Sequence, residues 1–151
     1  MRPRPPSSPS GAGADRPRTP RASHPPDRGP WLLWLLPGIW MGLIFVASHT
    51  PGTDVPNLWF WKLPHADKIG HGIMYFVLAL TFYVPLSRRT VPDRPGLAAF
   101  LAALLSVLYG FTDEMHQSMV PGRTPAWDDI VADLVGAGIA ALLAGTLGSR
   151  R

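Results

Sequence analysis

The 151-residue sequence contains no cysteine. This absence excludes disulfide bonds, thiolate catalysis and every zinc site that needs a cysteine ligand. The sequence also lacks a Gly-x-Ser-x-Gly motif, so a common signal of a serine nucleophile is missing. Charged residues make up only 16% of the chain, whereas hydrophobic residues make up an ordinary 46%. The scarce charges are gathered in short patches, and the uncharged runs between them predict the fold.

Four long runs without a charged residue follow one another after residue 28. They cover residues 29–48, 69–87, 95–112 and 134–149, and the last can be extended back to residue 130 across one Asp. A helix needs about 20 apolar residues, with roughly 17 as a lower limit, to cross the hydrocarbon core of a bilayer. We therefore predict an all-α integral membrane protein whose four transmembrane helices form one domain, residues 31–148. Residues 1–30 are rich in Pro, Arg and Ser and are predicted to be a disordered tail.

The distribution of charge predicts how these helices cross the membrane. The tail, the connection around residues 88–94 and the C-terminus together hold eleven basic residues and three acidic ones. The other two connections, with the helix ends beside them, hold three basic residues and seven acidic ones. Positively charged segments stay in the cytoplasm, so both termini are predicted to be cytoplasmic. The basic residues thus have a topological explanation, and we predict no binding to nucleic acid. A signal peptide explains the first run less well, because the basic segment before it is thirty residues long.

Local patterns add finer expectations. Pro37 and Gly38 should kink the first span, and the spacing of Gly136 and Ala140 should let two helices approach closely. A helix continued from Gly96 to Val120 would be about 37 Å long, so its last part should emerge at the outer surface or fold along it. Pro121 and Gly122 should then form a turn. Trp59, Phe60 and Trp61 should lie in the outer interface.

Ionisable residues from three segments converge on one membrane face in this arrangement. Asp67, Lys68 and His71 begin the second span, and Asp113, Glu114, His116 and Gln117 end the third. Arg123 follows the turn, and Asp128, Asp129 and Asp133 begin the fourth span. Helical spacing brings Asp67, His71 and Tyr75 together, and also Asp113, His116 and Gln117. Ionisable groups inside a membrane are costly and usually pair, which makes this cluster a candidate functional site.

The segments that carry these residues resemble the VanZ-like family of small bacterial membrane proteins. The matching elements are Ser48, DKIGHGIMYFVLAL at 67–80, DEMHQSMVPGR at 113–123 and DDIVADLVGAGIA at 128–140. Asp133 departs from the pattern, because many members have Asn there. The resemblance implies a protein of the bacterial inner membrane. The family's namesake is associated with resistance to teicoplanin, a glycopeptide that binds cell-wall precursors outside the membrane.

Four interpretations of the cluster stay open. In a purely structural network, Lys68 would pair with an acid, Arg123 with Asp128 or Asp129, and His71 with Asp67 or Glu114. A metal site could draw on several acceptable ligands, which are His65, Asp67, His71, Glu114, His116 and Asp129. A hydrolase or transferase could use Glu114 or His71 as a general base on a lipid-linked substrate, since Ser48 and Ser118 have no evident partner. A proton or cation transporter would need several copies, because four spans make a thin pathway.

Our preferred prediction is a VanZ-like envelope protein that acts on or shields a cell-wall or lipid component at the outer face. Its partners would be membrane lipids and such a component, with a homo-oligomer left open. The predicted ligand-binding residues are Asp67, Lys68, His71, Glu114, Gln117, Arg123 and Asp129. Glu114 and Asp129 would hold or polarise the ligand, Lys68 and Arg123 would meet an anionic group, and His71 would change protonation. We predict no cofactor and no metal; His71, Glu114 and His116 are the candidates if one binds.

Overall fold

The computed structural model describes residues 29–50, 64–124 and 126–150, and this part of the chain is all helical. The helices are α1 (Gly29–Leu32), α2 (Leu35–His49), α3 (Ala66–Pro85), α4 (Pro95–Gln117) and α5 (Trp127–Gly148), with a π-helical turn, η3 (Leu86–Thr90), after α3. The all-helical prediction is confirmed for these residues. Most of the predicted tail and the Trp59–Trp61 segment lie outside them.

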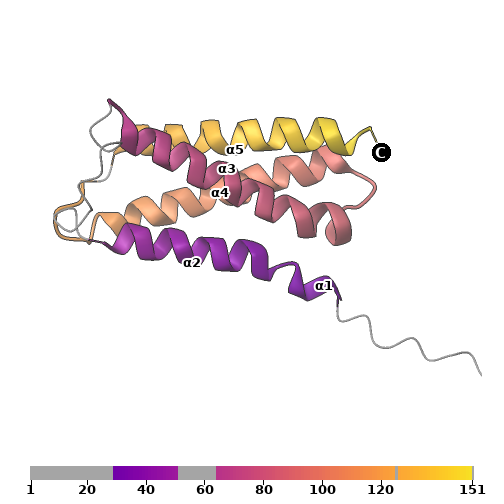
Figure 1. Ribbon diagram of the computed structural model, residues 1–151, viewed down its shortest axis with the longest axis horizontal. Helices are drawn as coiled ribbons and strands as arrows, with labels where there is room; N and C mark the ends of the chain where they lie inside the picture. The colour runs from indigo at the N-terminus through magenta and orange to yellow at the C-terminus, as the bar shows by residue number, and fades with distance from the viewer. Residues whose placement is uncertain (1–28, 51–63, 125, 151) are drawn as a thin grey trace, which may run out of the picture.

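The long helices lie side by side and alternate in direction (Figure 1). Helix α3 packs against both α4 and α5, which also pack against each other, and α2 lies against α3 and α4. One end of the bundle holds the end of α2, the start of α3, the end of α4 and the start of α5; we call it the acid-rich end. The other holds Arg88, Arg89, Arg94 and Arg150, and we call it the arginine-rich end.

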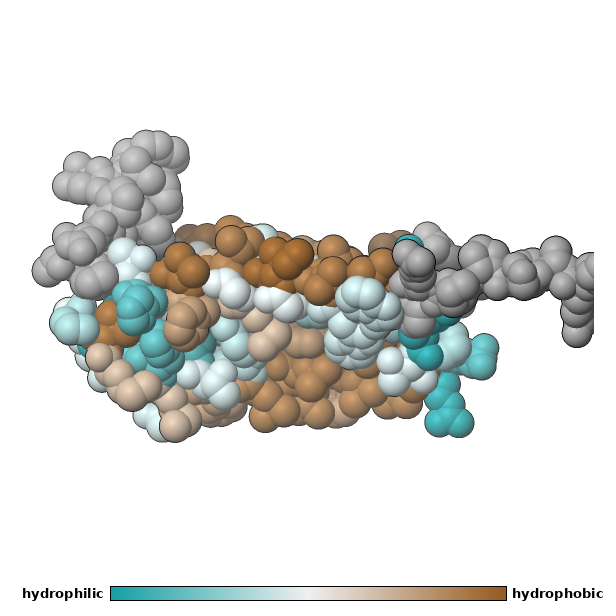
Figure 2. All heavy atoms as spheres, turned by 90° about the horizontal axis from the view of Figure 1, so that it is seen from below, coloured by the Kyte–Doolittle hydropathy of each residue, from teal (hydrophilic) through white to brown (hydrophobic). Residues whose placement is uncertain are grey.

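The face of the bundle drawn in Figure 2 is mostly apolar between its two ends. Large hydrophobic side chains point outward along the helices, and Leu142 is 71% exposed. The interior instead contains many small residues, among them Ala98, Ala102, Ala137 and Ala140. This distribution suits lipid around the bundle, because helices in membranes pack through small residues and turn large apolar ones outward. Helices α3 with η3, α4 and α5 are long and apolar enough to cross a membrane.

The first predicted span is interrupted. Helix α2 has only 15 residues, and a short break at Leu33 and Trp34 separates it from α1. Pro37 explains the position of the break, because proline has no N–H to donate to the carbonyl four residues earlier, which is that of Leu33. The predicted kink is therefore present just before Pro37. A complete fourth span stays a prediction, as does the side of the membrane on which the termini lie.

Two further local predictions are confirmed. The Arg123 N–H donates to the Val120 carbonyl over 3.1 Å, and Gly122 has a φ of 75°, so Pro121 and Gly122 form the expected turn. A Cβ on Gly136 would collide with the backbone of Gly72, at 2.8 Å from its carbonyl carbon. Helices α3 and α5 thus approach as closely as the small-residue spacing predicts. This close approach brings the first turns of α3 and α5 together at the acid-rich end.

Candidate functional site

Lys68, in the first turn of α3, is surrounded by carboxylates. Its Nζ lies 2.9 Å from Asp67 Oδ2 and 3.3 Å from Asp128 Oδ2, and it also forms an ion pair with Asp129 Oδ1. The Asp67 and Asp128 side chains are 60% and 68% exposed, whereas that of Asp129 is 10% exposed. Exposed ion pairs contribute little, so Asp129 is the partner that fixes Lys68 in the structure. The predicted pairing of Lys68 with an acid is confirmed.

His71 lies one helical turn further along α3, and its partner is Asp133. His71 Nδ1 is 3.0 Å from Asp133 Oδ1, and both side chains are nearly buried. The imidazole also stacks on Tyr75, with ring centroids 6.3 Å apart. The expected pairing of His71 with Asp67 or Glu114 is therefore wrong. The close contact of α3 and α5 at Gly72 and Gly136 places Asp133, one turn from Gly136, against His71 instead.

The carboxyl group of Asp133 fits against α4 because position 110 is a glycine. A Cβ on Gly110 of α4 would lie 2.6 Å from Asp133 Oδ2, so a larger residue at position 110 would displace the carboxylate. Asp133 is buried, and Oδ2 has no hydrogen-bond partner among the described residues. The same holds for the hydroxyl of the fully buried Tyr75. The sequence placed Asp133 in the cluster of ionisable residues but not among the predicted ligand-binding residues.

A second buried group of polar side chains joins α2 to α4. Ser48 Oγ donates to Asp113 Oδ2 over 2.8 Å, and Gln117 Nε2 donates to the same oxygen over 2.9 Å. Gln117 also donates to Ser48 Oγ over 3.3 Å. The expectation that Ser48 has no partner is wrong, because its partner lies 65 residues away on another helix. The i, i+4 spacing correctly brought Asp113 and Gln117 together.

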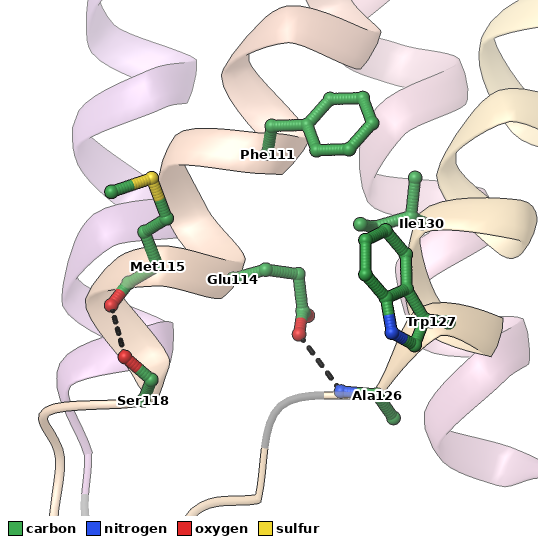
Figure 3. A pocket seen from close by; sticks show the side chains of 7 residues that line it. All are labelled: Phe111, Glu114, Met115, Ser118, Ala126, Trp127 and Ile130. Atoms are coloured by element: carbon green, nitrogen blue, oxygen red, sulfur yellow. Dashed lines mark hydrogen bonds between the residues drawn. The ribbon is translucent and has the colours of Figure 1, made fainter.

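Glu114 points away from this group and into the space between α4 and α5 (Figure 3). Its Oε2 accepts the Ala126 N–H over 3.0 Å, whereas its buried Oε1 has no partner among the described residues. Glu114 is one wall of a pocket of about 310 Å³ that is otherwise mostly apolar. The other lining residues are Phe111, Met115, Ser118, Ala126, Trp127 and Ile130. A carboxylate in an apolar pocket can hold the polar group of a ligand that is itself largely apolar.

Three of the predicted site residues meet around one point. His71, Glu114 and Asp129 each offer a ligand atom, and these atoms lie within 4.8 Å of one another. Asp67 contacts Lys68 at the surface, and Gln117 belongs to the Ser48–Asp113 group. The structure therefore divides six of the seven predicted site residues between two polar groups, one around Lys68, His71, Glu114 and Asp129 and the other formed by Ser48, Asp113 and Gln117. Arg123 belongs to neither group.

Arg123 has a different role from the two that the sequence predicted. Its Nε donates to the Thr50 carbonyl and its Nη2 to the Ala47 carbonyl, each over 3.1 Å. The guanidinium thus caps the C-terminal end of α2, where carbonyls lack helical partners. Its expected pairing with Asp128 or Asp129 is wrong, and contact with an anionic ligand stays a prediction.

His116 lies on the opposite side of α4 from Glu114 and faces α2. Its Nε2 is 3.3 Å from His49 Nδ1, and its ring stacks on Phe45 at 4.5 Å between centroids. Of the three candidate metal ligands, His71 and Glu114 are together and His116 is not. His65 is exposed at the start of α3 and does not belong to the group of three either.

Comparison with known families agrees with the resemblance seen in the motifs. A family model described as VanZ/LLP1 matches residues 33–148. Searches of curated proteins and of solved structures returned no match. The match covers α2 to α5 and therefore includes every residue of the two polar groups. The chain belongs to the VanZ/LLP1 family of membrane proteins.

Proposed function

We propose that this protein works at the outer face of the bacterial cytoplasmic membrane, where its acid-rich end holds a lipid-linked or cell-wall component. In this proposal the chain crosses the membrane four times, with α1 and α2 forming the first span and both termini in the cytoplasm. The arginine-rich end supports that orientation, because basic residues are retained on the cytoplasmic side. Binding at the outer face would contribute to resistance against glycopeptides such as teicoplanin, the resistance with which the family's namesake is associated.

The observation that carries the proposal is the pairing of the buried Glu114 carboxylate with an apolar pocket. The pocket lies between the last turns of α4 and the first turns of α5, beside residues that would face lipid. A ligand with an acyl or prenyl chain and a polar head fits this combination, because the chain can lie among Phe111, Trp127 and Ile130 while the head reaches Glu114. A lipid-linked cell-wall component has these two parts.

Neighbouring residues would assist without touching the ligand's chain. Lys68 holds Asp129 in place through their ion pair, and Asp133 orients His71. Arg123 fixes the end of α2 and thereby the Ser48–Asp113–Gln117 group behind the site. These contacts would keep Glu114 and Asp129 preorganised, which lowers the cost of binding a ligand.

Glycopeptide susceptibility of a host lacking the protein tests the proposal. The host would be complemented with wild type, Glu114→Gln or Asp128→Asn, with protein levels in the membrane matched by immunoblot. Both variants remove one negative charge at the same end, but Asp128 is exposed and does not line the pocket. We expect Glu114→Gln to lose protection and Asp128→Asn to keep it. If wild type gives no protection, or both variants behave alike at equal levels, the proposal fails.

A further inference from the structure

The meeting point of His71, Glu114 and Asp129 has properties beyond those of a salt-bridge network. The three residues come from three different helices, α3, α4 and α5, and all are at least half buried near the acid-rich end. Their ligand atoms lie within 4.8 Å of one another. One imidazole and two carboxylates are groups that bind divalent metal ions.

A buried carboxylate oxygen at this point has no partner. Glu114 is only 6% exposed, and its Oε1 accepts no hydrogen bond from any described residue, although Oε2 is satisfied by the Ala126 N–H. A buried polar atom that lacks a partner costs about 1–3 kcal/mol, so it needs an explanation. A cation held by Oε1 supplies one.

The orientation of His71 also suits a metal. Its Nδ1 is engaged by the buried carboxylate of Asp133 at 3.0 Å, which leaves Nε2 as the nitrogen able to donate a lone pair. Metal-binding histidines commonly have a carboxylate on the second nitrogen, because it fixes the tautomer and the ring orientation. Asp133 provides this support from outside the group of three.

The excess of buried negative charge also favours a bound cation. Four carboxylates are buried here, those of Asp113, Glu114, Asp129 and Asp133. Lys68 is the one Lys or Arg of the described residues that forms an ion pair with any of them, through Asp129 Oδ1, and Arg123 is bound to backbone carbonyls. Several buried negative charges with one ammonium group are costly. A divalent cation would reduce this excess of negative charge. Because Lys68 pairs with Oδ1 of Asp129, the other oxygen, Oδ2, is available to bind the cation.

From these four observations we infer that His71, Glu114 and Asp129 bind one divalent transition-metal ion, with Zn²⁺ as the fitting type. The imidazole favours such ions over Mg²⁺ and Ca²⁺, which prefer oxygen ligands alone. The site is part of the cluster assigned above to ligand binding, and a metal there would present a positive charge to the anionic head group of a lipid-linked component.

Metal binding to the purified full-length protein in detergent micelles tests this inference directly. The protein would be stripped with a chelator and titrated with Zn²⁺, and its metal content measured by mass spectrometry after equilibrium dialysis. We expect one Zn²⁺ per chain. The expected affinity falls at least about tenfold in Glu114→Gln and in Asp129→Asn, because each removes a charged ligand. A large excess of Mg²⁺ should not displace the Zn²⁺.

Two controls separate this site from other sources of metal binding. Asp128→Asn removes the charge of the neighbouring acid, which also contacts Lys68 but lies outside the group of three. His116→Gln removes an imidazole from the exposed His49–His116 pair. Both are expected to leave the affinity within about twofold of wild type, because neither removes a proposed ligand.

Three results would overturn the inference: no stoichiometric Zn²⁺ in wild type, an equal loss in Asp128→Asn and Asp129→Asn, or loss of the bound metal in His116→Gln alone. The first would leave a buried water molecule as the partner of Glu114 Oε1. If a ligand variant fails to fold, Co²⁺ added to wild type decides the matter, since His and carboxylate coordination gives visible absorption that Zn²⁺ removes. No step depends on antibiotic susceptibility, so the metal site and the proposed function can fail separately.

Discussion

The two ends of the bundle carry opposite charges, which are exposed at the arginine-rich end and largely buried at the acid-rich end. At the arginine-rich end, Arg88, Arg89 and Arg94 are exposed, and the residues beneath them are apolar, among them Leu86 and Ala98. At the acid-rich end, four carboxylates are buried among hydrogen bonds that cross from helix to helix. Exposed charges are enough to set the direction of insertion. Buried ones are not needed for that purpose, so the acid-rich end is where a binding function is to be sought.

The contact between Gly72 of α3 and Gly136 of α5 holds the two helices together near the buried carboxylates. Disrupting this contact should have the largest effect on the acid-rich end. A Cβ at position 136 would overlap the backbone of Gly72, which cannot move aside as a flexible side chain would. We expect Gly136→Ala to lower the free energy of unfolding by at least about 2 kcal/mol, since overpacking a tight contact is destabilising. Unfolding in detergent micelles, followed by circular dichroism, measures this effect. Separation of α3 from α5 should also abolish Zn²⁺ binding, because His71 and Asp129 lie on opposite sides of the contact.

Gly138→Ala is the matched control for that substitution. Gly138 lies on the same helix two residues further on, and a Cβ there has nothing within 4 Å. Its stability should equal that of wild type or exceed it by up to about 1 kcal/mol, because Ala has a higher helix propensity than Gly and the added methyl group meets no neighbour. Equal destabilisation by both variants would mean that helix α5 does not pack on Gly72 through Gly136.

Replacing one serine at each end by alanine compares the two ends directly, with a smaller expected loss of stability than for Gly136→Ala. Ser48 donates to the buried Asp113, whereas Ser87 donates within its own chain segment to the Val84 carbonyl, over 3.4 Å. Ser48→Ala removes a donor from a buried carboxylate and should cost about 1–2 kcal/mol. Ser87→Ala should cost less than about 0.5 kcal/mol, because its hydroxyl is only half buried and satisfies no charge. The same unfolding experiment compares them, and a larger loss in Ser87→Ala would contradict the assignment of the buried network.

Much of the fold was predictable because it depends on local properties of the sequence. Uncharged runs of sufficient length gave three of the long helices, and the spacing of small residues indicated the approach at Gly136. The break before Pro37 follows from the missing N–H of a proline. The first of the four predicted spans stays a prediction, because the 15 residues of α2 are too few by themselves to cross a membrane.

The site was predictable in its residues but not in its pairings. The sequence indicated which helix ends meet, so His71, Glu114 and Asp129 were all among the candidates. It could not show that His71 meets Asp133, because that depends on how far α3 is shifted along α5. Nor could it show that Ser48 reaches Asp113 or that Arg123 turns to the carbonyls of α2. Rotations of the helices about their axes decide such contacts, and hydrophobic patterning leaves those rotations loosely defined when lipid surrounds the bundle.

A single introduced cysteine should disturb the structure least, and it tests on which side of the membrane each end of the bundle lies. Because the chain has no cysteine, a single one can be introduced at an exposed position of either end. Thr124→Cys places a thiol at the acid-rich end and Thr90→Cys at the arginine-rich end, and both positions are exposed. Neither change should alter stability by more than about 0.5 kcal/mol. A maleimide that cannot cross the membrane should label the Thr124→Cys variant in intact cells and the Thr90→Cys variant only after the membrane is opened. The reverse pattern would place the buried carboxylates in the cytoplasm, and binding of an external cell-wall component would then be ruled out whatever metal the site holds.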